Sequence, residues 1–201
     1  MKRFRDVRRA LHLGTLTILM SSPLWFLGCS PKKTEVAPQS QEKTLSKAPA
    51  QQPTNNRYQL GTPVVFGLGG TAGPFKVSGW SQDEQGHTWT DKELAVLSFQ
   101  IEPGQEPLVL RMTLTGLTKE PSLPFQPVEV DVNGSKVADW QVANTSQFTT
   151  VIPPEAVKGG GSLRIEFKTP KATSPASLGM NGDSRVLGIS VSDLVIDKGA
   201  H

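Results

Sequence analysis

Apolar and polar residues alternate along most of the chain that follows Tyr58. In 108–115 every second residue is a leucine or a methionine, and 128–133 and 163–168 repeat the pattern with valine, leucine, isoleucine and phenylalanine. A period of two over five to eight residues is typical of a half-buried β-strand. The weaker alternation elsewhere predicts further strands at 62–66, 75–80, 94–101, 136–142, 147–152 and 186–196.

Turn-forming residues separate these segments, at Pro103-Gly104, Pro121 to Pro127, Pro153-Pro154 and 159–161. No window carries a sustained helical pattern. About nine short strands with turns between them predict an all-β fold, an antiparallel two-sheet sandwich. One-sided alternation fits that architecture, because each sheet then buries one face against the other.

The segment Val128–Val142 carries the most specific local signal. Asn133-Gly134 between two apolar strands favours a two-residue type I′ hairpin turn. That turn pairs Asp131 with Lys136, which have opposite charges. It also places Trp140 on the outer face, unless a β-bulge returns this side chain to the core. We favour the bulge, because an isolated exposed tryptophan is uncommon.

The first nine residues hold five basic side chains and one acidic one, and an apolar run follows from about 10 to 27. A positive start before an apolar segment is typical of an export signal. The run ends in Gly28-Cys29, which resembles the lipobox of bacterial lipoproteins. The resemblance implies that 1–28 is a signal peptide and that Cys29 carries acyl chains, such as palmitate, that anchor it in a lipid bilayer.

An uncleaved anchor helix is the alternative for this segment, and both interpretations place the rest of the chain outside the inner membrane. Ser30 stands where Asp would have resembled an inner-membrane retention signal, so the lipobox resemblance favours the outer membrane. Residues 29–57 are rich in proline and polar side chains, which predicts a disordered linker between the anchor and a folded domain at 58–201.

The formal net charge of +3 is unevenly distributed along the chain. The signal contributes +4 and the linker +3, whereas 58–201 has 11 basic and 15 acidic residues and a net charge of −4. A nucleic-acid partner is therefore not expected, because the predicted domain lacks the basic balance that such binding requires.

The chain offers little catalytic chemistry. Of its three histidines, His12 lies in the predicted signal and His201 is the last residue, so His87 is the only one inside the predicted domain, and no Gly-x-Ser-x-Gly elbow is present. Residues 67–72 match Gly-x-Gly-x-x-Ala, but strand-like residues follow where a dinucleotide site needs a helix. The single cysteine excludes a disulfide framework and a cysteine zinc site. We expect no enzymatic activity. An envelope hydrolase that uses exposed carboxylates is a weaker hypothesis than a binding or a structural protein.

The segment 79–90 is the strongest candidate for ligand binding. Trp80 and Trp89 offer flat indole faces that stack on sugar rings, and Asp83, Glu84 and His87 offer hydrogen-bonding groups for hydroxyls. We expect this segment to be a loop. The alternative is that both tryptophans close one end of the sandwich core.

Short motifs recur in a fixed order through this part of the chain: Gly79-Trp80-Ser81 with Glu84, Gly86 and Trp89, then Val132-Asn133-Gly134, Ser174-Pro175, Leu178-Gly179, Asp183-x-Arg185 and Leu187-Gly188-Ile189. With these motifs the chain from about Tyr58 to Asp197 resembles the jelly-roll, carbohydrate-binding-module-like domains appended to bacterial envelope glycosyltransferases. The resemblance implies a jelly-roll fold and affinity for sugars. It also implies a separate glycosyltransferase or envelope assembly protein as partner, because no catalytic domain is fused to this chain.

Asp183 and Arg185 lie two residues apart before the last predicted strand. They could clamp a sugar, and Asp183 with Asn181 could instead help hold a structural calcium ion. A third interpretation is an ion pair between Arg185 and Glu84 that holds the tryptophan segment against the sheet.

The sequence thus predicts a lipid-anchored, non-enzymatic protein of the periplasm or outer membrane whose sandwich binds or organises envelope polysaccharide or another glycan. The alternative is a structural or assembly lipoprotein that contacts a protein partner through a sheet edge or through an outer-face Trp140.

Overall fold

The computed structural model of the protein describes residues 56–157 and 159–199. The signal peptide, Cys29 and nearly all of the linker lie outside the described residues. None of the helices in the described ranges has the length and hydropathy that a membrane span requires.

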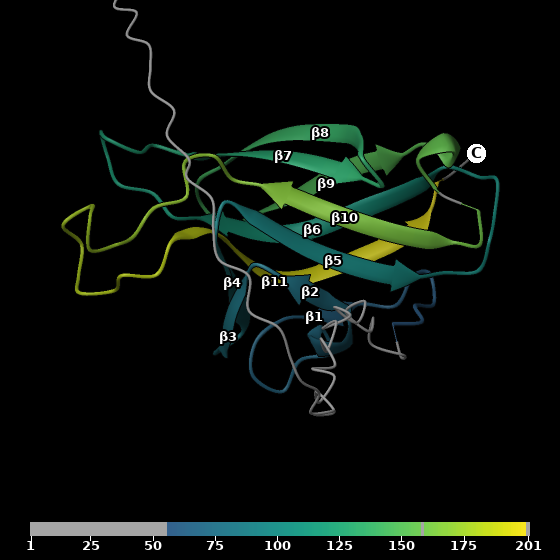
Figure 1. Ribbon diagram of the computed structural model, residues 1–201, viewed down its shortest axis with the longest axis horizontal. Helices are drawn as coiled ribbons and strands as arrows, with labels where there is room; N and C mark the ends of the chain where they lie inside the picture. Colours follow the sequence, from purple (N-terminus) through teal and green to yellow (C-terminus); the bar gives the residue numbers. More distant parts are fainter. Residues whose placement is uncertain (1–55, 158, 200–201) are drawn as a thin grey trace, which may run out of the picture. The chain divides into compact units, whose positions relative to one another are not determined.

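The described residues form two antiparallel sheets, stacked as the two layers of a sandwich (Figure 1). The six-stranded sheet contains, in spatial order, β3 (Trp80–Glu84), β4 (His87–Asp91), β11 (Leu187–Lys198), β6 (Leu108–Gly116) and β9 (Ser146–Ile152), and β1 (Val64–Val65) pairs with β11. The five-stranded sheet contains β2 (Lys76–Ser78), β5 (Leu94–Gln100), β10 (Ser162–Lys168), β7 (Gln126–Val132) and β8 (Ser135–Val142). Two short 3-10 helices, η1 (Gly73–Phe75) and η2 (Pro154–Ala156), lie in the connections.

The order of the strands confirms the jelly-roll prediction. If β4 to β11 are counted as strands one to eight, one sheet has the order 1-8-3-6 and the other has the order 2-7-4-5. This interleaving of two sheets by consecutive strands is the eight-stranded jelly roll, to which β1, β2 and β3 are added.

Alternation along the strands places the core between the two sheets. In β6 the leucines and Met112 are buried, whereas Val109, Arg111, Thr113 and Thr115 are only partly buried. The five-stranded sheet contributes inward-facing side chains such as Phe99, Ile165 and Phe167, each fully buried. Each sheet therefore has one dry face and one outer face, as the sequence predicts.

All nine predicted strands are present, but the expectation that 79–90 is a loop is wrong. These residues form the β3–β4 hairpin at the edge of the six-stranded sheet. The pattern of the sequence hides this hairpin, because the inward positions of β4 are Thr88 and Thr90, which are polar although fully buried.

The β7–β8 hairpin and its bulge are confirmed. Asn133 and Gly134 both have positive φ, as a type I′ turn requires, and Asp131 lies opposite Lys136 in the ladder. The expected charge pair between these two side chains does not form, because Asp131 binds Lys168 and Lys136 binds Glu129 and Asp139. The register shifts between Val130 and Asp131, which returns Trp140 to the inner face. Trp140 is 9% exposed and packs on Phe148, with ring centroids 5.4 Å apart. This burial removes the outer-face position on which a protein-contact role for Trp140 depends.

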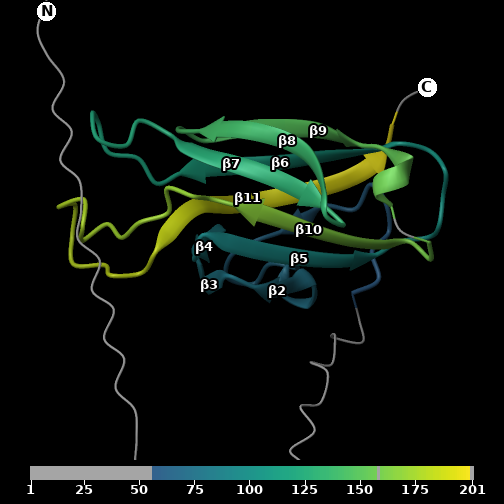
Figure 2. The same ribbon diagram turned by 45° about the horizontal axis from the view of Figure 1, so that its top comes forward.

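The connections gather at two opposite ends of the sandwich. The β6–β7 loop and the long β10–β11 loop project from one end, at the left of Figures 1 and 2. The β5–β6 loop, η2 and the end of β11 lie at the other end.

Candidate functional site

The β3–β4 hairpin brings five of the predicted site residues together. Trp80 pairs with Thr90, Asp83 with Thr88 and Glu84 with His87, and the register shifts between Trp80 and Asp83. Trp89 follows Thr88 on β4. These positions fix which of the five side chains point into the sandwich and which point to its outer face.

Trp80 is partly buried and packs against the core, so its ring does not face outward as a binding surface. Its Nε1 donates a hydrogen bond to the carbonyl oxygen of Val96 at 2.9 Å. Its ring packs on Phe66 and Phe167, with centroids 5.4 and 6.3 Å away. For Trp80 the core-closing alternative is therefore the better one.

Trp89 lies on the outer face of the six-stranded sheet. Its neighbours Thr88 and Thr90 are fully buried, so alternation along the strand directs Trp89 and His87 outward. The two rings meet edge to face, with centroids 5.9 Å apart and an interplanar angle of 86°. Both side chains are partly exposed, which leaves part of the indole surface available to a ligand.

Asp83 joins the two sheets at their open edge. Its Oδ1 accepts hydrogen bonds from Lys76 Nζ on β2 and from Thr88 Oγ1 on β4, each at 2.5 Å. The bond from Lys76 contributes most, and that from Thr88 next, to holding the pKa of Asp83 below its ordinary value. Asp83 therefore has a structural role, because its carboxylate connects β2 to the β3–β4 hairpin.

The loop at Gly67 packs directly against the hairpin. The backbone N–H of Gly67 donates to Thr88 Oγ1 at 3.1 Å. Gly67 has a φ of 91°, and a Cβ there would lie 2.5 Å from the backbone nitrogen of His87. Only glycine allows this close approach, so the residues that resemble a dinucleotide motif serve to cover the β3–β4 hairpin.

Arg185 forms a clamp between the β10–β11 loop and β3. Its Nη1 donates to Glu84 Oε1 at 2.8 Å and to Ser81 Oγ at 2.7 Å, and its Nη2 donates to Asp183 Oδ2 at 2.6 Å. The contact with Glu84 agrees with the ion pair considered from the sequence. Hydrogen bonds from Arg185 hold the pKa of Asp183 below its ordinary value, and the two carboxylates raise the pKa of Arg185.

The clamp is continuous with the outward-facing rings of β4. Glu84 Oε2 lies 3.4 Å from His87 Nε2, and His87 in turn contacts Trp89. A chain of contacts therefore runs from Asp183 through Arg185, Glu84 and His87 to the Trp89 indole. We refer to these five residues as the corner cluster.

The residues considered for calcium do not fit a calcium ion. Asn181 Oδ1 accepts the backbone N–H of Asp183 at 2.9 Å, and both carboxylate oxygens of Asp183 accept hydrogen bonds from the Arg185 guanidinium. Calcium prefers six to eight oxygen ligands, and a neighbouring guanidinium repels it. Among the described residues, no group of three or more His, Cys, Asp and Glu side chains is arranged to hold a metal ion.

A row of polar side chains beside Trp89 was missed from the sequence. Ser190 on β11 is the cross-strand partner of both Trp89 and Thr115, so Thr115 lies about 10 Å from Trp89, two strand spacings away. Thr115 Oγ1 contacts Thr145 Oγ1 at 2.7 Å. Four threonines and one glutamine on this outer face form a polar surface that we call the hydroxyl face. Its residues are Thr113, Thr115, Thr145, Gln147 and Thr149.

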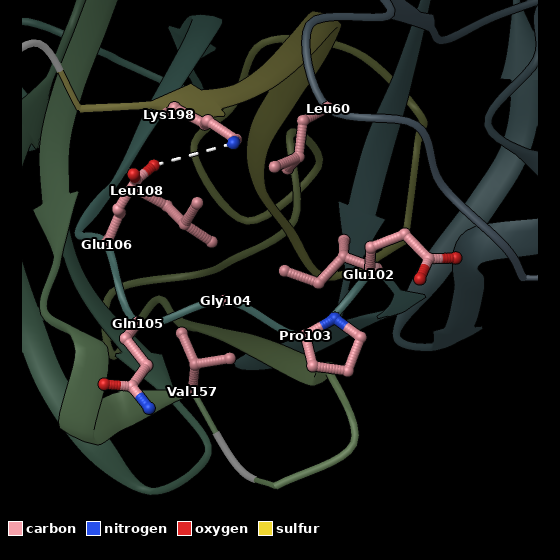
Figure 3. A pocket seen from close by; sticks show the side chains of 10 residues that line it. Leu60, Glu102, Pro103, Gly104, Gln105, Glu106, Leu108, Val157 and Lys198 are labelled. Carbon is pink, nitrogen blue, oxygen red and sulfur yellow. Dashed lines mark ion pairs between the residues drawn. The ribbon is translucent and has the colours of Figure 1, made fainter.

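A separate hollow of about 300 Å³ lies among the connections at the opposite end of the sandwich. Figure 3 shows Leu60, Leu108 and Val157 around it, and the ion pair of Lys198 with Glu106, 3.6 Å long, at its rim. Its ten lining residues include no aromatic side chain, so it lacks a flat surface for stacking on a sugar ring.

No protein-family model and no curated protein matches the chain. Among solved structures, the chain is similar to the CBM22-1 xylan-binding domain of Paenibacillus barcinonensis Xyn10C, with 14% identity and a TM-score of 0.43 over 69% of this chain and 95% of that one. It is also similar to the CBM36-1 domain of a multidomain xylanase from the hindgut metagenome of Trinervitermes trinervoides, with 10% identity and a TM-score of 0.42 over 70% and 98%. The C-terminal CBM6 of LamC, a marine laminarinase from Zobellia galactanivorans, has 8% identity and a TM-score of 0.40 over 68% and 98%.

Proposed function

We propose that the sandwich binds carbohydrate on the outer face of the six-stranded sheet, with Trp89 as the stacking surface. The observation that carries this proposal is the position of Trp89, directed outward between the other four residues of the corner cluster and the hydroxyl face. An indole face stacks on the apolar face of a sugar ring, and threonine hydroxyls can both donate to and accept from sugar hydroxyls.

The two cations that bind the β3–β4 hairpin, Arg185 and Lys76, are already paired, which favours an uncharged glycan as ligand. The guanidinium of Arg185 is already bound by two carboxylates and a serine, and Lys76 is bound to Asp83. Neither cation is left to pair with an acidic sugar. A neutral polysaccharide needs no such partner, because hydroxyl groups satisfy its hydrogen bonds.

The same proposal places this domain at the cell envelope and assigns it binding without catalysis. The envelope location is supported by the sequence before residue 56: the predicted export signal, the lipobox-like Gly28-Cys29 and the polar linker. Acyl chains on Cys29 would hold the chain at a membrane while the domain binds envelope polysaccharide, in partnership with a separate glycosyltransferase or assembly protein.

Affinity electrophoresis of the purified full-length chain through gels that contain neutral or acidic polysaccharides tests the carbohydrate proposal. We expect at least one neutral polysaccharide to retard the wild type and to leave Trp89→Ala unretarded. Leu94→Ala is the matched control, because Leu94 is an apolar residue 41% exposed on the other sheet, and it should migrate as the wild type does. Equal migration of wild type and Trp89→Ala in every gel would contradict the proposal.

A further inference from the structure

Two asparagine–glycine pairs occur in the described residues, and the structure holds them differently. Asn133-Gly134 forms the turn between β7 and β8, and Asn181-Gly182 lies in the exposed β10–β11 loop. Glycine after asparagine favours deamidation, because its missing side chain leaves the backbone nitrogen free to approach the asparagine side-chain carbonyl.

The side chain of Asn133 is fixed by three hydrogen bonds. Its Nδ2 donates to the carbonyl oxygens of Ala156 and Ser162, both at 2.8 Å, and its Oδ1 accepts the backbone N–H of Arg164 at 3.0 Å. For its carbonyl carbon to reach the nitrogen of Gly134, all three bonds must break. The folded domain therefore protects Asn133.

Asn181 is exposed, and within the described residues its side chain makes one hydrogen bond, in which Oδ1 accepts the backbone N–H of Asp183. That bond does not protect the side chain. It polarises the carbonyl that would be attacked, and it stabilises the negative charge that develops on the oxygen during attack. The amide group Nδ2, which would leave, has no hydrogen-bond partner among residues 56–157 and 159–199.

We propose that Asn181 is a site of spontaneous deamidation in the folded protein. The backbone nitrogen of Gly182 attacks Cγ of Asn181 and loses its proton, and the side-chain nitrogen departs with that proton as ammonia, which closes a succinimide ring. Water then opens either carbonyl of the ring, giving aspartate or isoaspartate at position 181. The reaction needs water alone as co-reactant.

The product changes the surroundings of the Arg185 clamp. A new carboxylate appears two residues from Asp183, whose oxygens bind Arg185. Isoaspartate also inserts an additional carbon into the backbone and removes the side-chain carbonyl that holds the Asp183 N–H. The deamidation of Asn181 does not depend on the proposed carbohydrate binding. Only an effect of deamidation on glycan binding would rest on that proposed function.

Timed peptide mapping by mass spectrometry tests the proposal, on full-length protein kept folded at mildly alkaline pH and, in parallel, in concentrated urea. We expect Asn181 to deamidate at least about tenfold faster than Asn133 in the folded protein, because only Asn133 must first break its hydrogen bonds. In urea the two sites should react at similar rates.

Gly182→Ala is the matched control. A Cβ at this position meets no atom within 4 Å, and the φ of Gly182 is not in the left-handed region, so alanine leaves the fold intact. Its methyl group hinders the attacking nitrogen, and the variant should deamidate at 181 more slowly than the wild type. Equal rates at 133 and 181 in the folded protein, or an intact Asn181 while the unfolded chain reacts, would overturn the proposal.

Discussion

Arg185 Nη1 lies 2.8 Å from Glu84 Oε1, although the two residues are 101 positions apart in the sequence. Asp183 binds the other side of the same guanidinium through Nε and Nη2. A planar guanidinium can satisfy two carboxylates at once with several parallel hydrogen bonds. This single side chain therefore connects the β10–β11 loop to β3 and orders the corner cluster around Glu84.

Replacing Arg185 should loosen this connection. Arg185→Ala leaves two carboxylates facing each other, and we expect the free energy of unfolding to fall by about 1 kcal/mol at most, because the side chain is about one-third exposed and water screens its ion pairs. Arg185→Lys should recover only part of the loss, since an ammonium group lacks the fork that reaches both carboxylates. Urea denaturation measures both effects.

Arg164→Ala is the control for that comparison. Arg164 pairs with Glu166 two residues away on the same strand, so its ion pair connects no separate elements. We expect no measurable loss of stability. If Arg164→Ala lost as much stability as Arg185→Ala, the Arg185 clamp would stabilise the domain no more than an ion pair within one strand.

Asp83 should make the stability of the domain sensitive to acid. Its pKa is lowered in the folded protein, chiefly by the hydrogen bond from Lys76. A carboxyl group with a lowered folded pKa contributes stability above its unfolded pKa of about 4, and this contribution is lost as the pH falls through the folded pKa. Asp83→Asn should therefore be less stable than wild type at neutral pH, and the difference should shrink below about pH 4.

Urea midpoints measured from neutral to acidic pH test this expectation. Glu155→Gln removes one negative charge from an exposed position and serves as the control for a change in net charge. A difference between wild type and Asp83→Asn that stayed constant across the acidic range would mean that titration of Asp83 is not linked to folding.

The strands with apolar alternation could be predicted from the sequence because their buried positions are apolar. Even the bulge that buries Trp140 could be predicted, since the Asn133-Gly134 turn fixes the register of the β7–β8 hairpin. The β3–β4 hairpin could not be predicted, because Thr88 and Thr90 are buried with their hydroxyls bound to Asp83 and to the Ile189 N–H. Here hydrogen bonds from distant segments replace the apolar side chains that a pattern detects.

The candidate site residues could be identified from the sequence, but the direction in which their side chains point could not. Trp80 and Trp89 lie nine positions apart, and the register shift between Trp80 and Asp83 directs one ring inward and leaves the other outward. The hydroxyl face was missed for a related reason. Thr115 and Trp89 lie on one surface only because β11 is inserted between β4 and β6, and this order depends on pairing across the whole domain.

Cys29→Ser should separate the two interpretations of the N-terminal segment. If Cys29 is lipidated, the wild type should incorporate labelled palmitate and fractionate with membranes, because several acyl chains suffice for stable anchoring. The variant should lose the label and keep its signal peptide, since lipobox processing requires the cysteine. Ser30→Ala is the control and should behave as the wild type does. Wild-type protein that carries no label and retains residues 1–28 would instead indicate an uncleaved anchor helix.

The two tryptophans of the β3–β4 hairpin should have opposite effects on stability and on binding. Trp80 donates a hydrogen bond within the fold and packs on Phe66 and Phe167. Because it is only partly buried, Trp80→Ala should lower the free energy of unfolding by about 2–3 kcal/mol, less than the loss of a fully buried tryptophan. Trp89 lies on the outer face, and Trp89→Ala should cost less than about 1 kcal/mol.

Urea denaturation and affinity electrophoresis of the same two variants test this contrast. Trp80→Phe preserves the apolar packing of Trp80 but removes its N–H donor, so its stability should lie between those of wild type and Trp80→Ala, and its glycan retardation should remain. If Trp89→Ala destabilised the domain as strongly as Trp80→Ala, a loss of retardation would reflect unfolding rather than a lost stacking surface. Trp89 is identified as a binding residue if Trp89→Ala loses glycan retardation while its free energy of unfolding stays close to that of wild type. If the ring were needed only for packing, its removal could abolish retardation only by destabilising the fold.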